Sequence, residues 1–307
     1  MAIPFTELNK INPSSIIELF ELELTVGKHI ATGTPQNLPT TYRFHAGANL
    51  NSFGEVVFQS NAYQRVAVKV EGFERKRIVN SAPDKNILSE LSSEKYVVAI
   101  GGGAVIDTAK ILCRTAIVCY PTTASGSTET SWSVYWDGSK KMSLKRYKPK
   151  EVIINSEFLN LPEKVIRDTT CDVVSHFLDS MFSKKKTEVS EEYCIEGLNL
   201  LRRKGSIVDL IRAGRLGGKA IEITGTNLLH SLSYPLTGIY GISHGEALGY
   251  FLPKISKFMG VDVSDITEEV SLNDIDIDLV IEEALKYDKI NECSIFIDRK
   301  TLQEVLE

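Results

Sequence analysis

The sequence predicts an α/β domain with a parallel sheet, followed by an all-α domain. Short apolar runs at residues 65–70, 96–100, 117–120 and 152–154 have the character of strands, and helical stretches separate them. The run at 96–100 is almost entirely apolar, as strands buried on both faces of a parallel sheet are. From about residue 156 the pattern changes to long helices with almost no strand character. Alternating strands and helices, followed by helices alone, predict this order of domains.

We divide the chain into an N-terminal extension, an α/β domain and a helical domain, at residues 1–40, 41–155 and 156–307. Within the extension, Ser15 and Glu18 resemble the capping box that begins a helix. Only residues 71–82 follow the strand at 65–70 before a proline. This leaves little room for the usual crossover helix, so we expect the parallel sheet domain to be abbreviated there.

Composition and charge exclude several classes of protein. Hydrophobic residues make up 43% of the chain and charged residues 24%, as in ordinary globular proteins. No apolar run approaches the ~18–20 residues that cross a bilayer, and the N-terminus lacks the features of a signal peptide. A net charge of −5 argues against nucleic-acid binding. Five scattered cysteines without a CxxC pair predict free thiols. We therefore expect a cytoplasmic protein that binds neither nucleic acid nor membranes.

Three consecutive glycines, Gly101, Gly102 and Gly103, directly follow the apolar run at 96–100, and residues 104–110 are helix formers. Glycines let a phosphate approach the backbone, and a helix N-terminus offers free N–H groups with a partial positive charge. The turn does not match the GxGxxG fingerprint of dinucleotide-binding proteins. A purely structural turn therefore remains an alternative.

A second polar loop, PTTASGSTE at 121–129, follows the apolar run at 117–120 and contains five hydroxyl side chains. Such hydroxyls could bind a pyrophosphate or a nicotinamide ribose, although a Ser/Thr-rich turn can also satisfy its own backbone. Both loops come at the ends of predicted parallel strands, where open α/β sheets bind ligands. Together they favour a ligand crevice.

Three of the five histidines lie in the predicted helical half. His176 follows Asp172 by four residues, which places both side chains on one face of a helix. His230 and His244 belong to further helical stretches. Each feature alone has an ordinary explanation, as an exposed helical pair or as a histidine satisfied in the core. In combination, three imidazoles and one carboxylate suit Fe(II) or Zn(II) with room for a substrate oxygen.

Four segments resemble, in the same order, those of the iron-containing (group III) alcohol dehydrogenases: GGGAVIDTAK (101–110), PTTASGSTE (121–129), DVVSH (172–176) and HSLSYPLTGIYGISHG (230–245). The resemblance spans about residues 42–260. It implies the dehydroquinate synthase-like fold, in which a dinucleotide-binding domain precedes a helical domain. It also implies NAD(H) or NADP(H) and a metal ion, Fe(II) or Zn(II), in the cleft between them. The usual GTGSE of the second segment reads SGSTE here.

The resemblance implies a role for each of several residues in this sequence. The implied metal ligands are Asp172, His176, His230 and His244. The implied cofactor-binding residues are Gly101, Gly102, Gly103, Asp107, Thr122, Thr123, Ser127 and Lys141. Many relatives have a further histidine four residues after the first C-terminal one, where this chain has Tyr234. Its phenol could relay a proton through water, or it could simply pack.

Within the family, the segments GKAIEIT (218–224) and WDGSKKMSL (136–144) look most like phosphonoacetaldehyde reductases, which form 2-hydroxyethylphosphonate. The implied partner is a small aldehyde or alcohol, phosphonate-bearing in this subgroup, and the implied assembly is a homodimer. A phosphonate needs a cationic anchor, for which the sequence offers Lys140, Lys145, Arg146 and Arg212.

Two alternatives remain open. The string HGEA at 244–247 also resembles glycerol-1-phosphate dehydrogenases and dehydroquinate-synthase-like lyases. Those proteins lack the histidine four residues after the metal-binding carboxylate, whereas His176 is present here. The second alternative is a truncated, non-catalytic homologue. It predicts decay of the ligand set, yet all four positions are intact.

Overall fold

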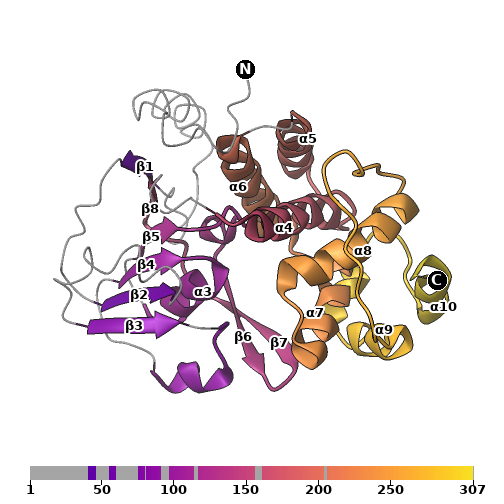
Figure 1. The fold of residues 1–307 in the computed structure, drawn as a ribbon, viewed down its shortest axis with the longest axis horizontal. Helices are drawn as coiled ribbons and strands as arrows, with labels where there is room; N and C mark the ends of the chain where they lie inside the picture. Colours follow the sequence, from indigo (N-terminus) through magenta and orange to yellow (C-terminus); the bar gives the residue numbers. More distant parts are fainter. Residues whose placement is uncertain are drawn as a thin grey trace.

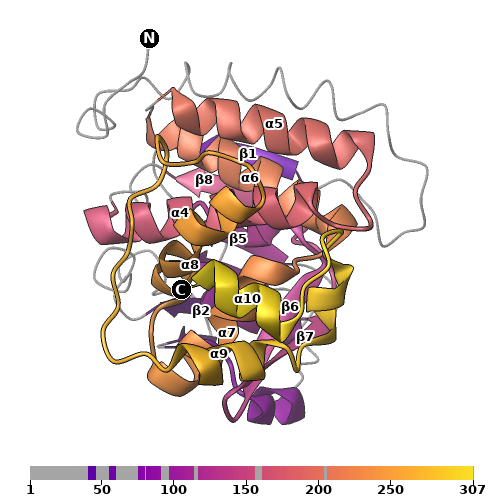
Figure 2. The same cartoon turned by 90° about the vertical axis from the view of Figure 1, so that its right-hand side faces the viewer.

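The computed structural model describes residues 41–45, 55–59, 75–79, 81–90, 97–113, 117–155, 161–203 and 206–306. A parallel sheet lies on one side and a group of helices on the other, with a two-stranded hairpin between them (Figure 1). Figure 2 shows the molecule from the helical side. The predicted N-terminal extension and the predicted strand at 65–70 lie outside the described residues. The expected shortening after that strand therefore stays a prediction.

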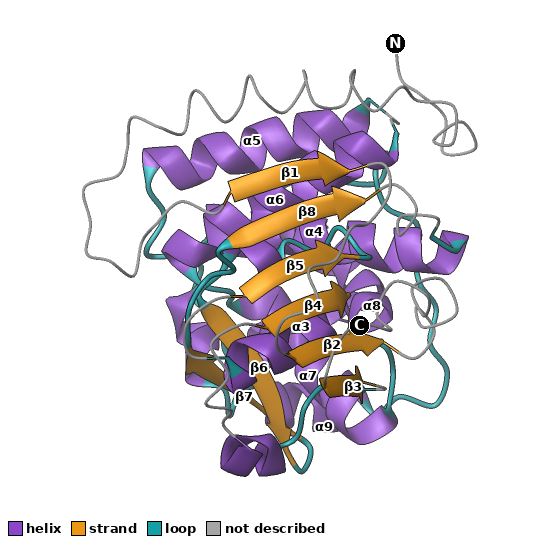
Figure 3. Cartoon of the chain, turned by 90° about the vertical axis from the view of Figure 1, so that its left-hand side faces the viewer, coloured by secondary structure: helices purple, strands orange, loops and turns teal. Residues whose placement is uncertain are grey.

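Six parallel strands form the sheet in the order β1-β8-β5-β4-β2-β3 (Figure 3). They are β1 (Thr41–His45), β2 (Glu55–Gln59), β3 (Arg75–Val79), β4 (Val97–Gly101), β5 (Ile117–Pro121) and β8 (Glu151–Asn155). Every residue of β4 and β5 is buried, which explains their continuous apolar character. The predicted strands at 96–100, 117–120 and 152–154 are confirmed to within a residue at either end. The sequence analysis missed β1, β2 and β3.

The direction of the chain across the sheet reverses between β2 and β4. β2 pairs with β3 on one side and with β4 on the other. From β2 the chain moves outward to β3, and it then returns to β4 and continues through β5 to β8. Ligands of open α/β sheets bind at such a switch point, outside the carboxyl ends of the strands. The glycine turn at 101–103 follows β4 and therefore stands at this place.

A helix and a hairpin complete the sheet side. Helix α3 (Gly103–Leu112) packs on β4, and two short 3-10 helices, η5 (Lys85–Glu90) and η6 (Ser127–Glu129), lie next to it. The antiparallel strands β6 (Trp132–Asp137) and β7 (Lys140–Lys145) are joined by a two-residue turn with Gly138 at φ +60°. The hairpin contacts both α3 and the later helix α7. It thus reaches from the sheet to the helices.

The C-terminal half is helical, as predicted. Its helices are α4 (Glu163–Met181), α5 (Glu188–Arg202), α6 (Ile207–Thr224), α7 (Leu228–Tyr240), α8 (His244–Phe258), α9 (Ile277–Ala284), η8 (Asp288–Glu292) and α10 (Arg299–Leu306). α4 is central and packs against α5, α6, α7 and α8. Among the described residues, no helix combines the length and apolarity needed to cross a membrane.

Helix α6 joins the two halves. Its first turns belong to the apolar core of the sheet, and its later residues belong to the core of the helices. At Gly214 its backbone touches the polar loop after β5, because a Cβ there would lie 1.6 Å from the carbonyl oxygen of Ala124. Only glycine permits this close approach.

We expect Gly214→Ala to lower the free energy of unfolding by about 3 kcal/mol, because the added methyl group must push two backbones apart. Urea denaturation measures the change. Gly103→Ala is the matched control, since a Cβ at that helical position meets nothing closer than Ser125 Oγ at 3.9 Å. The control should gain up to about 1 kcal/mol from helix propensity. Equal stability of the two variants would contradict the close contact.

Candidate metal centre and nucleotide crevice

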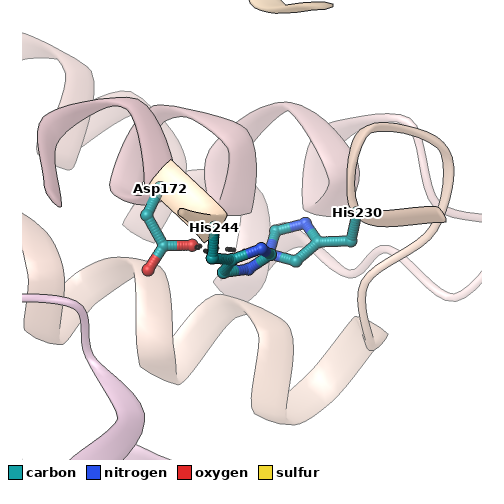
Figure 4. A group of neighbouring side chains, drawn as sticks. All are labelled: Asp172, His230 and His244. Carbon is teal, nitrogen blue, oxygen red and sulfur yellow. Dashed lines mark ion pairs between the residues drawn. The ribbon is translucent and has the colours of Figure 1, made fainter. Parts of the chain in front are cut away.

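Three imidazoles from three helices converge on one carboxylate oxygen. Oδ1 of Asp172 lies 3.4 Å from Nε2 of His176, 3.5 Å from Nε2 of His230 and 3.7 Å from Nε2 of His244. One ligand atom from each of Asp172, His230 and His244 lies within 4.8 Å of the other two, and Figure 4 shows these three side chains directed at a common point. The structure therefore brings together all four residues that the sequence analysis proposed as metal ligands.

Local structure explains this convergence. Asp172 and His176 are one turn apart on α4, and His230 lies in the first turn of α7. His244 is the first residue of α8. The glycine that follows it, Gly245, packs directly on α4, because a Cβ there would lie 2.3 Å from the carbonyl oxygen of Asp168. A larger residue would push the start of α8, and His244 with it, away from Asp172.

A buried aspartate that the sequence analysis missed fixes the orientation of His230. Asp179 is 0% exposed, and its carboxylate accepts hydrogen bonds from Nδ1 of His230 at 2.8 Å and from the backbone N–H groups of Asn227 and Leu229. Because Nδ1 carries the proton, Nε2 of His230 has a free lone pair. Asp179 lies seven residues after Asp172 on the same helix, and this spacing is the signal that could have identified it.

A serine fixes His244 in the same way. Ser233 Oγ donates to the carbonyl oxygen of His230 at 2.8 Å and lies 3.3 Å from Nδ1 of His244. With its single proton used, the hydroxyl can only accept from Nδ1–H of His244. Nε2 of His244 therefore also presents a lone pair toward Asp172.

The donor set fits a divalent ion. Among the described residues, the buried atoms Asp172 Oδ1 and His230 Nε2 have no hydrogen-bond partner, although they lie only 3.5 Å apart. Both are lone-pair donors, and two such buried groups facing each other are costly unless a cation lies between them. One carboxylate and three imidazoles are suitable ligands for Fe(II) or Zn(II).

The electrostatics of the cluster favour metal binding. Burial lowers the pKa of His176 to about 4, despite the opposing charge of Asp172. Burial lowers the pKa of His244 well below its ordinary value, and the ammonium of Lys141 adds to this effect. For Asp172, burial would raise the pKa, but His176 and the other imidazoles outweigh it and hold the pKa below its usual range. At neutral pH, His176, His244 and Asp172 are thus already in the forms that bind a metal.

These shifts predict that the metal-free protein loses stability in mild acid. An imidazole of the unfolded chain titrates near pKa 6.5, whereas folded His176 titrates near 4. Between these pH values the unfolded state binds a proton that the folded state does not. The free energy of unfolding should therefore fall with falling pH by about 1.4 kcal/mol per pH unit for this one histidine. His244 acts in the same direction.

Denaturation of chelator-treated protein at pH 7.5, 6.0 and 5.0 measures this dependence. His176→Gln should have a shallower slope than the wild type. Asp172 titrates below this window, because its pKa is lower than the ordinary 3.8. A free energy of unfolding that is constant between pH 7.5 and 5.0 would contradict the burial of neutral imidazoles.

The glycine turn lies as predicted between a strand and a helix. Gly101 ends β4, Gly102 is the N-cap of α3 and Gly103 is its first residue. A Cβ at Gly101 would meet a methyl group of Val105 at 2.4 Å, so the close turn requires glycine there. No side chain caps this end of α3, which leaves its first N–H groups directed at the switch point of the sheet.

The polar loop after β5 folds beside this turn. Thr122 donates its backbone N–H to the carbonyl oxygen of Gly101 at 3.0 Å, and the side chain of Thr123 adjoins Gly102. Ser127 has a buried hydroxyl without a hydrogen-bond partner among the described residues. Its carbonyl oxygen accepts from the fully buried ammonium of Lys110 at 2.7 Å. Lys110 therefore fixes the loop to α3.

Asp107 on α3 and Lys141 on β7 are the two remaining predicted cofactor residues. Burial raises the pKa of Asp107 to about 6, with Lys110 and Lys141 opposing the shift. The ammonium of Lys141 lies 4.5 Å from the ring centroid of Tyr234, whose ring stacks on His244 with the centroids 6.2 Å apart. The hairpin thus carries Lys141 to the boundary between the nucleotide turn and the helices.

Tyr234 is 4% exposed, and its phenol oxygen accepts a hydrogen bond from the ammonium of Lys289 at 2.6 Å. The sequence analysis did not identify Lys289, which comes from η8.

The sequence analysis placed its candidate anchors for an anion elsewhere. Arg146 instead donates to backbone carbonyls at the end of α3, and Lys140 and Lys145 are exposed on β7. Arg212 lines a separate surface pocket beside α5.

Comparison with known proteins gives related dehydrogenases. No protein-family model matches the sequence. The chain is 26% identical over 219 residues to 4-hydroxybutyrate dehydrogenase of Clostridium kluyveri, covering 56% of this chain and 57% of that protein. It is also 26% identical over 206 residues to phosphonoacetaldehyde reductase of Streptomyces viridochromogenes, covering 52% of each. The chain thus spans about half the length of the curated relatives it matches.

Solved structures share the fold over nearly their whole length. An iron-containing alcohol dehydrogenase from Thermotoga maritima matches with a TM-score of 0.71 and 20% identity, covering 87% of this chain and 96% of that one. Sulfoacetaldehyde reductase from Bifidobacterium kashiwanohense, solved with NAD+, matches with a TM-score of 0.73 and 18% identity, covering 90% and 98%. The chain thus has the fold of the solved iron-containing alcohol dehydrogenases and is similar in sequence to curated dehydrogenases and reductases. The resemblance of its motifs is thereby confirmed.

Proposed function

We propose that this chain is a metal-dependent alcohol dehydrogenase that uses NAD(H) or NADP(H) and acts as an aldehyde reductase. The observation that carries the proposal is the convergence of three imidazole nitrogens on Oδ1 of Asp172, with the lone pairs of His230 and His244 fixed toward it. The glycine turn at the switch point of the sheet supports a nucleotide cofactor.

In this proposal Asp172, His176, His230 and His244 hold Fe(II) or Zn(II). When bound, the ion supplies Lewis acidity that polarises the substrate carbonyl and stabilises the developing alkoxide. The turn at 101–103 and the start of α3 bind the cofactor pyrophosphate, while Asp107, Thr122, Thr123, Ser127 and Lys141 contact the rest of the nucleotide. The reaction is hydride transfer between nicotinamide C4 and the carbonyl carbon.

We assign a proton relay to Tyr234. The ammonium of Lys289 donates to its phenol oxygen, so the phenol's own proton remains for a second partner. Its ring stacks beside His244, which places it next to the metal cluster. Through a water molecule the phenol can supply the proton that an alkoxide needs to become an alcohol.

The proposed substrate is phosphonoacetaldehyde, reduced to 2-hydroxyethylphosphonate. Its support is the segments at 136–144 and 218–224 and the similarity to the Streptomyces reductase. Three similar proteins, 4-hydroxybutyrate dehydrogenase, phosphonoacetaldehyde reductase and sulfoacetaldehyde reductase, are named for compounds that carry an anionic group, whereas others, such as NAD-dependent methanol dehydrogenase, are named for neutral alcohols. We also propose a homodimer, which sedimentation tests. Five free cysteines among the described residues support the cytoplasm as its compartment.

The experiment is reconstitution with Fe(II) or Zn(II), followed by NADH and NADPH oxidation assays with phosphonoacetaldehyde, acetaldehyde and dihydroxyacetone phosphate. The proposal expects metal-dependent turnover, fastest with phosphonoacetaldehyde. Equal efficiency with acetaldehyde would remove only the phosphonate assignment. Preference for dihydroxyacetone phosphate would favour a glycerol-1-phosphate dehydrogenase. Bound metal without oxidation of either cofactor would indicate the non-catalytic homologue.

A further inference from the structure

Two lysines from distant parts of the chain flank the ring of Tyr234. Lys141 comes from β7, and its Nζ lies 4.5 Å from the ring centroid. Lys289 comes from η8, and its Nζ lies 4.8 Å from the same centroid. Both ammonium groups therefore lie one aromatic ring away from His244 and the metal cluster.

Neither ammonium forms an ion pair with an acidic side chain within the described part of the chain, although the charge of Asp107 acts on Lys141. Lys289 donates only to the hydroxyls of Thr226 at 2.9 Å and Tyr234 at 2.6 Å, which leaves one N–H donor unused. Within the same residues, the ammonium of Lys141 contacts the ring of Tyr234 and forms no ion pair. By contrast Lys286, three residues before Lys289, pairs with both Glu282 and Glu283.

A lysine ammonium without an ion-pair partner is costly in a largely buried place. Burial lowers the pKa of Lys289 to about 8, and only the more distant Asp179 opposes that shift. The carboxylate of Asp179 already accepts hydrogen bonds from the imidazole of His230 and from three backbone N–H groups. A metal ion on the neighbouring histidines would add further positive charge. The chain as a whole has a net charge of −5, but this site is locally positive. The site therefore favours binding of an anionic ligand.

We propose that Lys289, with the hydroxyl of Thr226, forms a subsite for a tetrahedral oxyanion on the substrate, and that Lys289 is its specificity-determining residue. This rests on the proposed function, because the subsite is assigned to the far end of an aldehyde whose carbonyl faces the metal cluster. The substrate class is a short aldehyde with a phosphonate or sulfonate group. Charge-assisted hydrogen bonds from the ammonium and a hydroxyl hold this group.

Calorimetric titration of the metal-reconstituted protein tests the subsite without requiring turnover. The probes are 2-hydroxyethylphosphonate, 2-hydroxyethanesulfonate and the neutral alcohol ethanol. Lys289→Gln should weaken binding of the phosphonate by about 10- to 100-fold, as expected for the loss of a charged donor. Lys286→Gln, the matched control three residues earlier in the chain, removes an exposed ammonium and should bind it within about twofold of the wild type. Lys289→Arg should retain more affinity than Lys289→Gln.

Kinetics provide a second measurement. With an anionic aldehyde, Lys289→Gln should raise KM more than it lowers kcat, because the anchor binds the part of the substrate that does not react. Equal phosphonate affinity of Lys289→Gln and Lys286→Gln would overturn the subsite, as would wild-type binding of ethanol as tightly as the phosphonate. Tighter binding of the sulfonate would support the subsite and replace the proposed substrate. Anion binding without any NADH or NADPH oxidation would count against the proposed function and leave the subsite standing.

Discussion

His230→Ala is expected to abolish the binding of a divalent ion and to lower aldehyde reduction by about 100-fold or more. His230 is 3% exposed and stands between Asp172 on one side and Asp179 on the other. Its removal takes away a lone pair whose direction is fixed. It also leaves the carboxylate of Asp172 opposite a cavity, and the remaining ligands cannot move into this space without moving α4 or α8.

Elemental analysis after reconstitution and desalting, together with the cofactor oxidation assay, measures both effects. Ser231→Ala is a suitable control, because its buried hydroxyl donates only to the carbonyl oxygen of Asn227 on the same helix. The control should retain a full complement of metal and most of the activity. Unchanged metal content and activity in His230→Ala would contradict the assignment of this histidine as a metal ligand.

Asp179→Asn should have the second largest effect, on stability as well as on metal affinity. The buried carboxylate accepts four hydrogen bonds, from one imidazole and three backbone N–H groups. An amide can accept at only one of its two terminal atoms and would direct N–H groups at other donors. We expect the free energy of unfolding to fall by about 3 kcal/mol. Zinc affinity should fall about 10- to 100-fold, because the orientation of His230 is lost.

Chelator competition for zinc and denaturation of the metal-free protein separate these two effects. Asp168→Asn is the matched control on the same helix, since that carboxylate pairs with Lys164 and Arg167 near the surface. It should cost less than about 1 kcal/mol. If Asp179→Asn binds zinc as tightly as the control does, then Asp179 is a structural residue and does not orient the ligand.

The sequence was informative where local pattern and tertiary position coincide. β4 and β5 are buried on both faces, so their apolar runs predicted strands directly. The edge strand β3 has the sequence RKRIV. Because three of its five residues are charged, it does not form an apolar run and was not predicted. The β6–β7 hairpin turns at Gly138-Ser139, a common hairpin signal that the sequence analysis quoted only as part of a family motif.

The same distinction applies to the candidate metal site, where some residues follow from local sequence pattern and others do not. The i, i+4 spacing of Asp172 and His176 follows from helix geometry, whereas His230 and His244 needed the order of the family's motifs. Lys289 could not be identified from sequence. It is distinguished by having no ion-pair partner among the described residues, and a sequence does not show which residues lie near each other. That property depends on η8 lying against α7, a long-range contact. The candidate anchors Lys140 and Lys145 had the right charge, but they lie on exposed positions of β7.

The central claim is that Asp172, His176, His230 and His244 together hold one divalent ion. Calorimetric titration of the chelator-treated protein with Zn(II) tests it most directly, in the wild type and in Asp172→Asn, His176→Gln and His244→Gln. We predict an endpoint at a single equivalent per chain in the wild type, and an affinity at least about tenfold weaker in each variant. No measurable binding in the wild type, or the same affinity in all four proteins, would contradict the claim.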